Sequence, residues 1–234
     1  MSEPAPRDEP QPDLRDGTVT RVVRQQRDAE RVSVFVDGAF AFGLALDLAV
    51  EAGLRKGKRL TVDEQRALLA QEQVHRARAA ALDYLSYGAK TTEEVRRKLR
   101  GKGFDEATVE DALAHMAEYG YLDDVAYARA FARGRFAGRG YGPQRLRTDH
   151  LRRGVSREAV DAALDDLTET ENVEEAARRH GRRRWRALAG EADVRRRKQK
   201  TMDFLVRRGF SFDLARTVID ELARGEGEDA DWQE

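Results

Sequence analysis

Arginine is the residue type through which this sequence can do chemistry, and it is concentrated in two stretches. Between Arg129 and Arg153 there are eight arginines and a single acid, Asp149. Between Arg178 and Arg208 there are thirteen basic residues against three acids. Guanidinium groups at this density can neutralise phosphates, so both stretches are candidates for nucleic-acid contact although the formal net charge of the chain is zero.

Aromatic side chains lie among the arginines of the first stretch. Tyr141 could stack on a base, a contact worth about 1–3 kcal/mol. For each arginine, a solvated helix face is the competing interpretation. The apolar residues of this stretch are expected to pack in the core: Phe131, Phe136, Leu146 and Leu151. The candidate contacts to nucleic acid or a partner protein are Arg129, Arg133, Arg135, Arg139, Tyr141, Arg145, Arg147, Arg152 and Arg153.

A secondary basic surface is expected from two further groups of charges. The second basic group, Arg182 to Arg184 and Arg195 to Lys200, is expected to be a partly frayed helix and a linker, whose charge density still suits non-specific phosphate binding. The members of this secondary surface are Arg96, Arg97, Lys98, Arg100, Lys102, Arg195, Arg196, Arg197, Lys198 and Lys200.

No pattern in the sequence indicates catalysis. There is no Gly-x4-Gly-Lys-Ser/Thr motif for a P-loop, and the glycines of 138–142 lack the preceding strand of a dinucleotide fold, so a hinge is favoured there. The absence of cysteine excludes thiol chemistry and disulfides, and the four histidines are not paired at helical spacing. Asp123 and Asp124 are expected to cap a helix, although an acidic edge can also contact a partner. We expect a non-enzymatic protein without cofactor or metal.

The arginines must be positioned by helices, and the helices follow a threefold repeat. When Gly103, Gly154 and Gly209 are aligned, the positions one, six, nine, ten and thirteen residues later are apolar in all three copies. A repeat unit of about fifty residues stacks on its neighbours because it cannot bury its apolar face alone. The gap of five residues between Leu146 and Leu151 predicts a kinked or shifted middle helix in the second copy.

The N-terminal part follows a period of two residues instead. Residues 18–23 and 32–36 are β-rich, and Asp37-Gly38 between apolar runs is a strong hairpin signal. A small antiparallel meander over 18–43 is too small to fold unaided. It serves either as a docking surface for a partner or as a cap on the first repeat. Thr61 to Glu64 forms a capping box that opens a long helix.

The predicted fold is therefore mainly α, an elongated tandem array of three-helix repeats with a small N-terminal antiparallel β meander. No apolar run is long enough for a membrane span and no signal peptide is evident, which predicts a cytoplasmic protein. Acidic tails at both ends either compete with nucleic acid for the basic surface or only aid solubility. The expected parts are 1–16 (disordered acidic, proline-rich tail), 17–60 (small β-rich module), 61–118 (first three-helix repeat with its leading helix), 119–168 (second three-helix repeat), 169–223 (third three-helix repeat) and 224–234 (acidic disordered tail).

Several short motifs occur along the chain in a definite order. Their combination is far more specific than any one of them. They are Val36-Asp-Gly-Ala-Phe-Ala-Phe-Gly43, Tyr121-Leu-Asp-Asp124 followed by Tyr127-Ala-Arg129, Gly142-Pro143 at the start of an arginine-rich helix, and Gly154-Val-Ser156.

In this combination the chain resembles the bacterial RecX family, regulators of the RecA recombinase, over residues 18–222. The resemblance implies arrays of three-helix repeats that bind the RecA filament on single-stranded DNA along its helical groove. It implies a negative regulator that damps strand exchange and ATP hydrolysis, in homologous recombination, DNA repair and the SOS response. Expected partners are RecA, its filament, and DNA bound without sequence preference as single strands and also duplex, by a monomer. The family has no known catalytic residue.

An alternative is a sequence-specific transcription regulator, because helix, turn, basic helix, turn and helix is also the pattern of a helix-turn-helix reader. Such a reader needs one recognition helix and often a dimer. Here the basic residues are spread over three repeats and no heptad zipper is present, which favours the groove-binding array. A helical scaffold with a partner unrelated to DNA is the third interpretation, and only the resemblance argues firmly against it.

Overall fold

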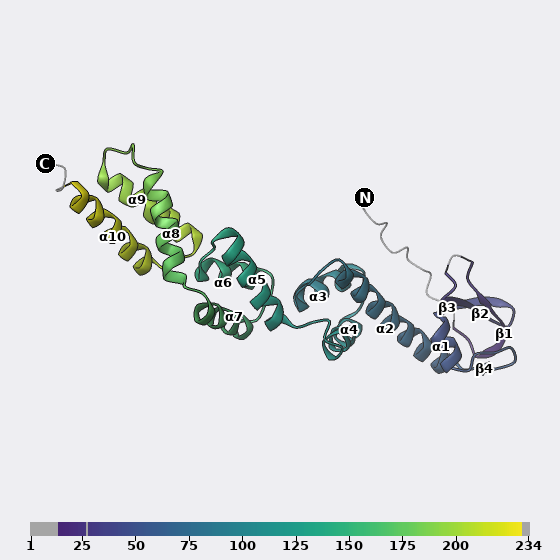
Figure 1. The fold of residues 1–234 in the computed structure, drawn as a ribbon. Coiled ribbons are helices and arrows are strands. Elements are labelled where there is room, and N and C mark those ends of the chain that lie inside the picture. The colour runs from purple at the N-terminus through teal and green to yellow at the C-terminus, as the bar shows by residue number, and fades with distance from the viewer. Residues whose placement is uncertain (1–13, 27, 231–234) are drawn as a thin grey trace. The chain divides into compact units, whose positions relative to one another are not determined.

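The computed structural model describes residues 14–26 and 28–230, which form a small sheet and a series of helices (Figure 1). The chain divides into two compact units. The first unit comprises residues up to 90 together with 94–122, and the second comprises 91–93 together with residues from 123 onward. In the part of the chain that the structure describes, no helix is both long enough and apolar enough to cross a membrane.

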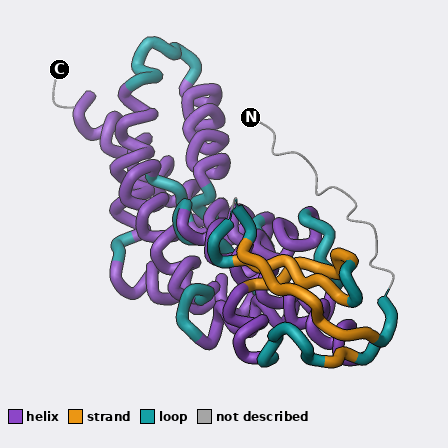
Figure 2. Tube along the Cα trace, turned by 90° about the vertical axis from the view of Figure 1, so that its right-hand side faces the viewer, coloured by secondary structure: helices purple, strands orange, loops and turns teal. Residues whose placement is uncertain are grey.

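The N-terminal strands, orange in Figure 2, form one antiparallel sheet. Their order in the sheet is β3-β2-β1-β4. Asp37 and Gly38, at φ 47° and 88°, make the turn between β2 and β3, which confirms the predicted hairpin. The predicted meander is confirmed, and β4 adds a short fourth strand that the sequence pattern did not indicate. The strands are β1 (Gly17–Arg24), β2 (Arg31–Val36), β3 (Ala39–Ala45) and β4 (Arg59–Leu60).

One face of the sheet packs on helices α1 (Leu46–Glu51) and α2 (Val62–Ser86) around a core that includes Leu44 and Leu68. Glu72 of α2 is buried beneath the strands. Its carboxylate accepts hydrogen bonds from the Arg31 guanidinium at 2.5 Å and from the backbone N–H of Ala45 at 2.7 Å. These contacts fix β2 and β3 to α2, as a structural cap on the first repeat requires.

The start of α2 also holds the end of the predicted N-terminal tail. The Asp16 carboxylate accepts from the Val62 N–H at 2.8 Å, and the Gln65 amide donates to the carbonyl of Arg15 at 2.7 Å. The capping box at Thr61 is confirmed. Residues 14–16 therefore belong to the fold and not to a tail, whereas the remainder of the predicted tail, residues 1–13, lies outside the described residues.

The helices from α2 onward form three groups of three, which confirms the repeat. Gly103, Gly154 and Gly209 follow the middle helices at φ 86°, 81° and 90°, a left-handed conformation that disfavours other residues. The groups are α2, α3 (Thr92–Gly101) and α4 (Glu106–Glu118); α5 (Asp124–Arg139), α6 (Pro143–Arg152) and α7 (Arg157–Thr170); and α8 (Val173–Arg186), α9 (Val194–Arg208) and α10 (Phe212–Ala230).

Two residues after each of these glycines, a polar side chain caps the last helix of the group. Asp105, Ser156 and Ser211 each accept from the backbone N–H three residues further on, at 2.9, 3.2 and 3.2 Å. The apolar positions that define the repeat are fully or partly buried in all three groups. The second and third groups share one continuous core, while the first has a core of its own.

The middle helix of the second group corrects two predictions. Helix α6 is continuous, without the expected kink, and Leu151 is 40% exposed, so its predicted place in the core is wrong. His150 is fully buried instead. It lies four residues before Gly154, where the other two groups have the buried residues Leu99 and Leu205.

Two helix boundaries also differ from expectation. The basic residues 182–184 and 195–200 form regular parts of α8 and α9, where a frayed helix and a linker were expected. Helix α10 continues to Ala230, beyond the expected end of the third repeat at residue 223. The last part of the predicted acidic tail, residues 231–234, lies outside the described residues.

Candidate nucleic-acid interface

The turn between α5 and α6 places the central candidate residues. Gly140 ends α5 at φ 63°. Beyond it, the Gly142 N–H donates to the carbonyl of Arg208 at 2.7 Å, and the Gln144 N–H donates to that of Gly209 at 3.0 Å. A Cβ on residue 142 would lie 2.5 Å from the Gly209 oxygen, so only glycine allows this approach. The expected hinge is thus a fixed turn, held on the end of α9.

Tyr141 sits on this turn among cations. The Arg145 guanidinium lies over its ring, 3.8 Å from the centroid. A hydrogen bond from Arg139 lowers the pKa of the Tyr141 hydroxyl, and the charges of Arg145, Arg139 and Arg135 lower it further. Since Arg145 covers one face of the ring, a base could stack only on the opposite face or in place of Arg145.

A second aromatic group organises two more of the candidates. Phe131, partly buried on α5, has the guanidinium carbons of Arg135 and Arg153 each 5.0 Å from its ring centroid. Tyr127 stacks on the same ring at 6.0 Å, and His150 meets it edge-on at 4.9 Å. Arg135 and Arg153 are therefore oriented by the ring, with their stems packed along the surface.

Arg129 and Arg147 both lie close to acidic side chains of the second repeat. Arg147 forms an ion pair with Asp161 of α7. The Arg129 Nε lies 3.9 Å from the Asp166 carboxylate, also on α7. Two of the predicted contacts thus have their charges offset by acids of the same repeat.

Arg133 and Arg152 remain the least compensated of the predicted contacts. Both are exposed, and neither has an ion pair with any other residue that the structure describes. Arg139 is exposed too, and its only acidic or phenolic partner in the described chain is Tyr141. Arg145 is partly exposed, and its Nε lies 4.0 Å from the Asp149 carboxylate of its own helix. Arg133, Arg139 and Arg152 therefore provide most of the available positive charge of α5 and α6.

The predicted secondary surface on α3 is largely neutralised. Arg96 pairs with Glu110 of α4 at 2.9 Å, and Arg100 pairs with Glu106 at 2.5 Å. The Lys98 ammonium lies 5.7 Å from the centroid of the Tyr84 ring. These basic residues hold α3 against its neighbours.

On α9, one member of the predicted surface is not at the surface. Arg197 is only 8% exposed; its guanidinium lies over the Trp185 ring at 4.2 Å and donates to the Trp185 carbonyl at 3.0 Å. Its assignment to a basic surface is therefore wrong. Arg196 and Lys198 approach Asp193 and Asp220 at 3.5 and 3.9 Å, and Lys200 pairs with Glu191.

The structure adds residues that sequence reasoning missed. Arg208 donates to the carbonyl of Arg139 at 2.5 Å, and Arg145 donates to that of Arg207 at 3.2 Å, so the end of α9 joins the Tyr141 turn. His180 of α8 lies beside this junction, where burial and the charge of Arg208 lower its pKa. The sequence does point to Arg208, because it directly precedes a repeat glycine, as the predicted contact Arg153 does.

Comparison with known families identifies every part of this architecture. The Regulatory protein RecX N-terminal domain matches residues 17–61. The first, second and third three-helix domains of RecX match residues 77–116, 123–164 and 172–219.

Curated relatives show the same likeness over most of the chain. The regulatory protein RecX of Bacillus licheniformis is 32% identical over 87% of this chain and 76% of its own length. That of Leuconostoc citreum is 30% identical over 88% of this chain and 76% of its own. That of Clostridium botulinum is 28% identical over 87% of this chain and 95% of its own.

Solved structures agree. A crystal structure of a regulatory protein RecX superposes with a TM-score of 0.72 at 26% identity, covering 87% of this chain and 99% of that one. The crystal structure of RecX from Lactobacillus salivarius, at 24% identity, gives a TM-score of 0.60 over 65% of this chain and 98% of that one, and so supports the fold.

Proposed function

Because this chain belongs to the RecX family of regulatory proteins, we propose that it regulates the RecA recombinase by binding the RecA filament on single-stranded DNA. The regulation is negative: the bound protein damps strand exchange and ATP hydrolysis. It acts without catalysis of its own. DNA is contacted directly by the basic helices, without sequence preference, and the protein lies in the groove of the filament.

The observation that carries this proposal is the exposed positive charge of α5, α6 and the turn at Tyr141 between them, which together we call the Tyr141 surface. Arg133, Arg139, Arg145 and Arg152 lie on α5, α6 and the ends of these helices. The turn between them is held by backbone hydrogen bonds to α9, which fixes the ring and its neighbouring charges before any ligand binds. A preorganised surface loses less conformational entropy on binding.

Phosphate contact and stacking are the two chemistries that this surface offers. Arginine binds phosphate through paired N–H donors, and Tyr141 provides a ring for a base. Arg135 and Arg153, oriented by Phe131, extend the charge along the same repeat. Arg129 and Arg147 contribute less, because acids of α7 offset their charges.

A filament offers the same binding sites again and again along its groove. Several weak contacts from one chain then add through effective concentration, so no single contact needs to be strong. A protein seated in this way obstructs the second DNA strand and holds the filament in a less active state. Inhibition of both strand exchange and hydrolysis follows.

The alternative of a sequence-specific regulator lacks a free recognition helix. On α3, Arg96 and Arg100 are paired with acids of α4, and on α6, Arg147 is paired with Asp161. Side chains held in this way do not reach base edges in a major groove. The middle helices therefore favour a role in the fold over base reading.

The test is DNA-dependent ATP hydrolysis by RecA of the same organism, with this protein titrated over preformed filaments. A triple variant, Arg133→Gln, Arg139→Gln and Arg152→Gln, removes exposed charge from the Tyr141 surface. A control, Arg24→Gln, Arg55→Gln and Arg66→Gln, removes the same charge from exposed positions of the first unit.

The wild type and the control are expected to suppress hydrolysis with increasing dose, and the triple variant to do so more weakly. The salt dependence of DNA binding should also fall, by about 0.7–0.9 in slope for each lost phosphate contact. A wild-type protein that leaves both hydrolysis and strand exchange unchanged contradicts the proposed function.

A further inference from the structure

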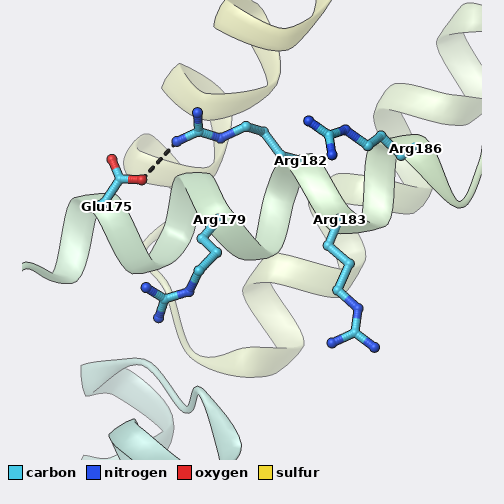
Figure 3. Close-up of a pocket in the computed structure, with 5 residues that line it drawn as sticks. All are labelled: Glu175, Arg179, Arg182, Arg183 and Arg186. Atoms are coloured by element: carbon cyan, nitrogen blue, oxygen red, sulfur yellow. Dashed lines mark hydrogen bonds and ion pairs between the residues drawn. The ribbon is translucent and has the colours of Figure 1, made fainter.

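Helix α8 carries a basic face of its own. Arg179, Arg182, Arg183 and Arg186 are all exposed and, with Glu175, line a shallow pocket of about 470 Å³. Figure 3 shows Arg182 and Arg186 extending to one side of the helix and Arg179 and Arg183 to the other. We refer to these four arginines as the α8 arginine face.

Most of the charge of this face is uncompensated. Arg182 pairs with Glu175 at 2.8 Å, the contact drawn in Figure 3. Arg179, Arg183 and Arg186 have no ion pair with any residue between 14 and 230 that the structure describes. Three exposed guanidinium groups on adjacent turns thus lie outside ion-pair distance of every described acid.

Two other arginines of α8, unlike these three, contact acids or lie near an aromatic ring. Arg178 pairs with Glu221 of α10 at 3.1 Å and with Glu174 at 3.4 Å. Arg184 lies 5.7 Å from the centroid of Phe204 on α9. The helix therefore places one set of arginines against its own repeat and leaves the other set unpaired.

Leaving these charges unpaired is unfavourable for the helix itself. Arg179 and Arg183, and likewise Arg182 and Arg186, are like charges four residues apart, a spacing that destabilises a helix. The helix dipole favours cations in the last turn, which accounts for Arg183 and Arg186 but not for Arg179. An anionic ligand would offset the repulsion along the whole face.

The dimensions and the lining of the face specify the ligand. From Arg179 to Arg186 the helix rises about 10 Å, which is about three nucleotide steps of one B-form strand. Among the residues whose side chains the structure describes, the lining consists of Glu175 and the arginines, without an apolar or aromatic side chain. A repeated phosphate fits this lining, whereas a stacked base finds no ring there.

We propose that the α8 arginine face is a binding site for the phosphodiester backbone of nucleic acid, which it holds without stacking or reading the bases. This inference rests on the nucleic-acid part of the proposed function and deepens it. The protein then has two unlike contacts in its second unit: the Tyr141 surface, with a ring among the charges, and the α8 arginine face, with charge alone.

The experiment measures direct binding of the full chain to DNA in the absence of RecA, across a salt series. The probes are a fluorescent oligo-dT strand, a strand of equal length with abasic sites throughout, and a duplex. The test variant is Arg179→Gln, Arg183→Gln and Arg186→Gln. The control variant, Arg157→Gln, Arg216→Gln and Arg224→Gln, removes equal charge from exposed positions of the same unit.

The test variant is expected to lose affinity for the oligo-dT and abasic strands to the same extent. Its log–log salt slope should fall by about 2 on single strands, at about 0.7 for each of three lost contacts. The control should keep the wild-type slope. Replacing the same three arginines by lysine retains the charge and should restore most of the slope, which separates lost charge from misfolding.

Four results would overturn the inference. They are an unchanged slope in the test variant, an equal loss in the control, a loss on oligo-dT alone, and weakened damping of RecA with DNA binding intact. The last would assign the face to an acidic protein surface. If the wild type binds DNA through α8 but leaves RecA hydrolysis unchanged, the proposed function fails and this site stands.

Discussion

The first and second repeats share an ion pair between their middle and last helices. Arg96 and Arg147 lie seven residues before the repeat glycine, and Glu110 and Asp161 lie seven residues after it. Arg96 meets Glu110 at 2.9 Å, and Arg147 pairs with Asp161 in the same way. In these two repeats, one arginine of the middle helix is therefore neutralised by an acid of the last helix and joins the two helices.

The third repeat has Met202 and Arg216 at the corresponding positions, so the pair is absent. Among the described acids, Arg216 approaches Asp220 of its own helix, at 4.0 Å. Several arginines of this repeat, among them Arg179, Arg183 and Arg186 on its first helix, have no ion pair with a described residue. The density of basic residues in a sequence therefore does not measure the positive charge available to a ligand, because acids of the same repeat neutralise part of that charge.

A contact between a cation and an aromatic ring occurs in the first and third repeats, although different residues form it. Tyr84 lies three residues after the buried Ala81, and Arg184 three residues after the buried Gly181. Tyr84 meets Lys98 in the first repeat, and Arg184 meets Phe204 in the third, each at 5.7 Å. Lys98 and Phe204 both precede their repeat glycine by five residues. The cation and the ring have exchanged places while the contact is kept, which favours a structural role for it.

Truncation of core side chains should lower the stability most, and it should do so equally in the second and third repeats. Leu164 and Ile219 occupy the same repeat position and are 4% and 3% exposed. Leu164→Ala and Ile219→Ala are each expected to lower the free energy of unfolding by about 2–5 kcal/mol, through lost burial and a residual cavity. Denaturant unfolding measures both. A variant that unfolds at the wild-type midpoint would remove that position from the core.

A smaller effect is expected where the second repeat meets the third. At Gly140 a Cβ would lie 2.0 Å from the His180 Nε2, and the left-handed backbone disfavours alanine by about 1–2 kcal/mol before the clash is added. Gly140→Ala should therefore destabilise the second unit, and His180→Ala should relieve part of the loss in the double variant.

Gly138 supplies the matched control. It lies on α5, and a Cβ at this residue would have nothing within 4 Å, so Gly138→Ala is expected to leave stability unchanged or raise it by up to about 1 kcal/mol. Thermal unfolding of the four variants is the measurement. Equal melting temperatures for Gly138→Ala and Gly140→Ala would contradict the close contact at His180.

The smallest effect tests the ion pairs directly. A double-mutant cycle on Arg147 and Asp161 is expected to give a coupling of about 0.2–1 kcal/mol, as exposed pairs do. A cycle on Met202 and Arg216 should give none, and Met202→Arg with Arg216→Glu should install a coupling of similar size. Equal coupling energies for Arg147–Asp161 and for Met202–Arg216 would contradict the difference between the second and third repeats.

The elements that the sequence predicts well are those with local causes. Gly103, Gly154 and Gly209 occupy left-handed positions, and Asp37-Gly38 forms the hairpin turn, because each depends on the backbone of a few neighbouring residues. The apolar spacing after the glycines likewise predicts the buried faces of α4, α7 and α10.

The errors arise where the environment comes from distant parts of the chain. His150 is a core residue because the carbonyls of Leu146 and Ala128 face its ring nitrogens at 2.6 and 3.0 Å, and Ala128 belongs to another helix. Arg197 is buried because Trp185 provides both a ring and a carbonyl. Such partners leave no local pattern.

The same limit applies to the candidate interface. The run of arginines on α5 and α6 is visible in the sequence, but the acids that neutralise Arg129 and Arg147 lie on α7. The sequence therefore predicts which repeat carries the charge. It does not predict which arginines remain available, since that depends on how three helices pack.

The backbone hydrogen bonds from Gly142 and Gln144 to the end of α9 have a consequence for how the chain can be divided. They sit between two repeats that share one core containing Leu146, Leu167 and Phe210. The amide protons of Gly142 and Gln144 should thus exchange with solvent only when both repeats open together. A chain ending after α7 would lose the acceptors for both amides and six of the sixteen buried residues of the shared core. The second repeat therefore depends on the third for part of its own stability.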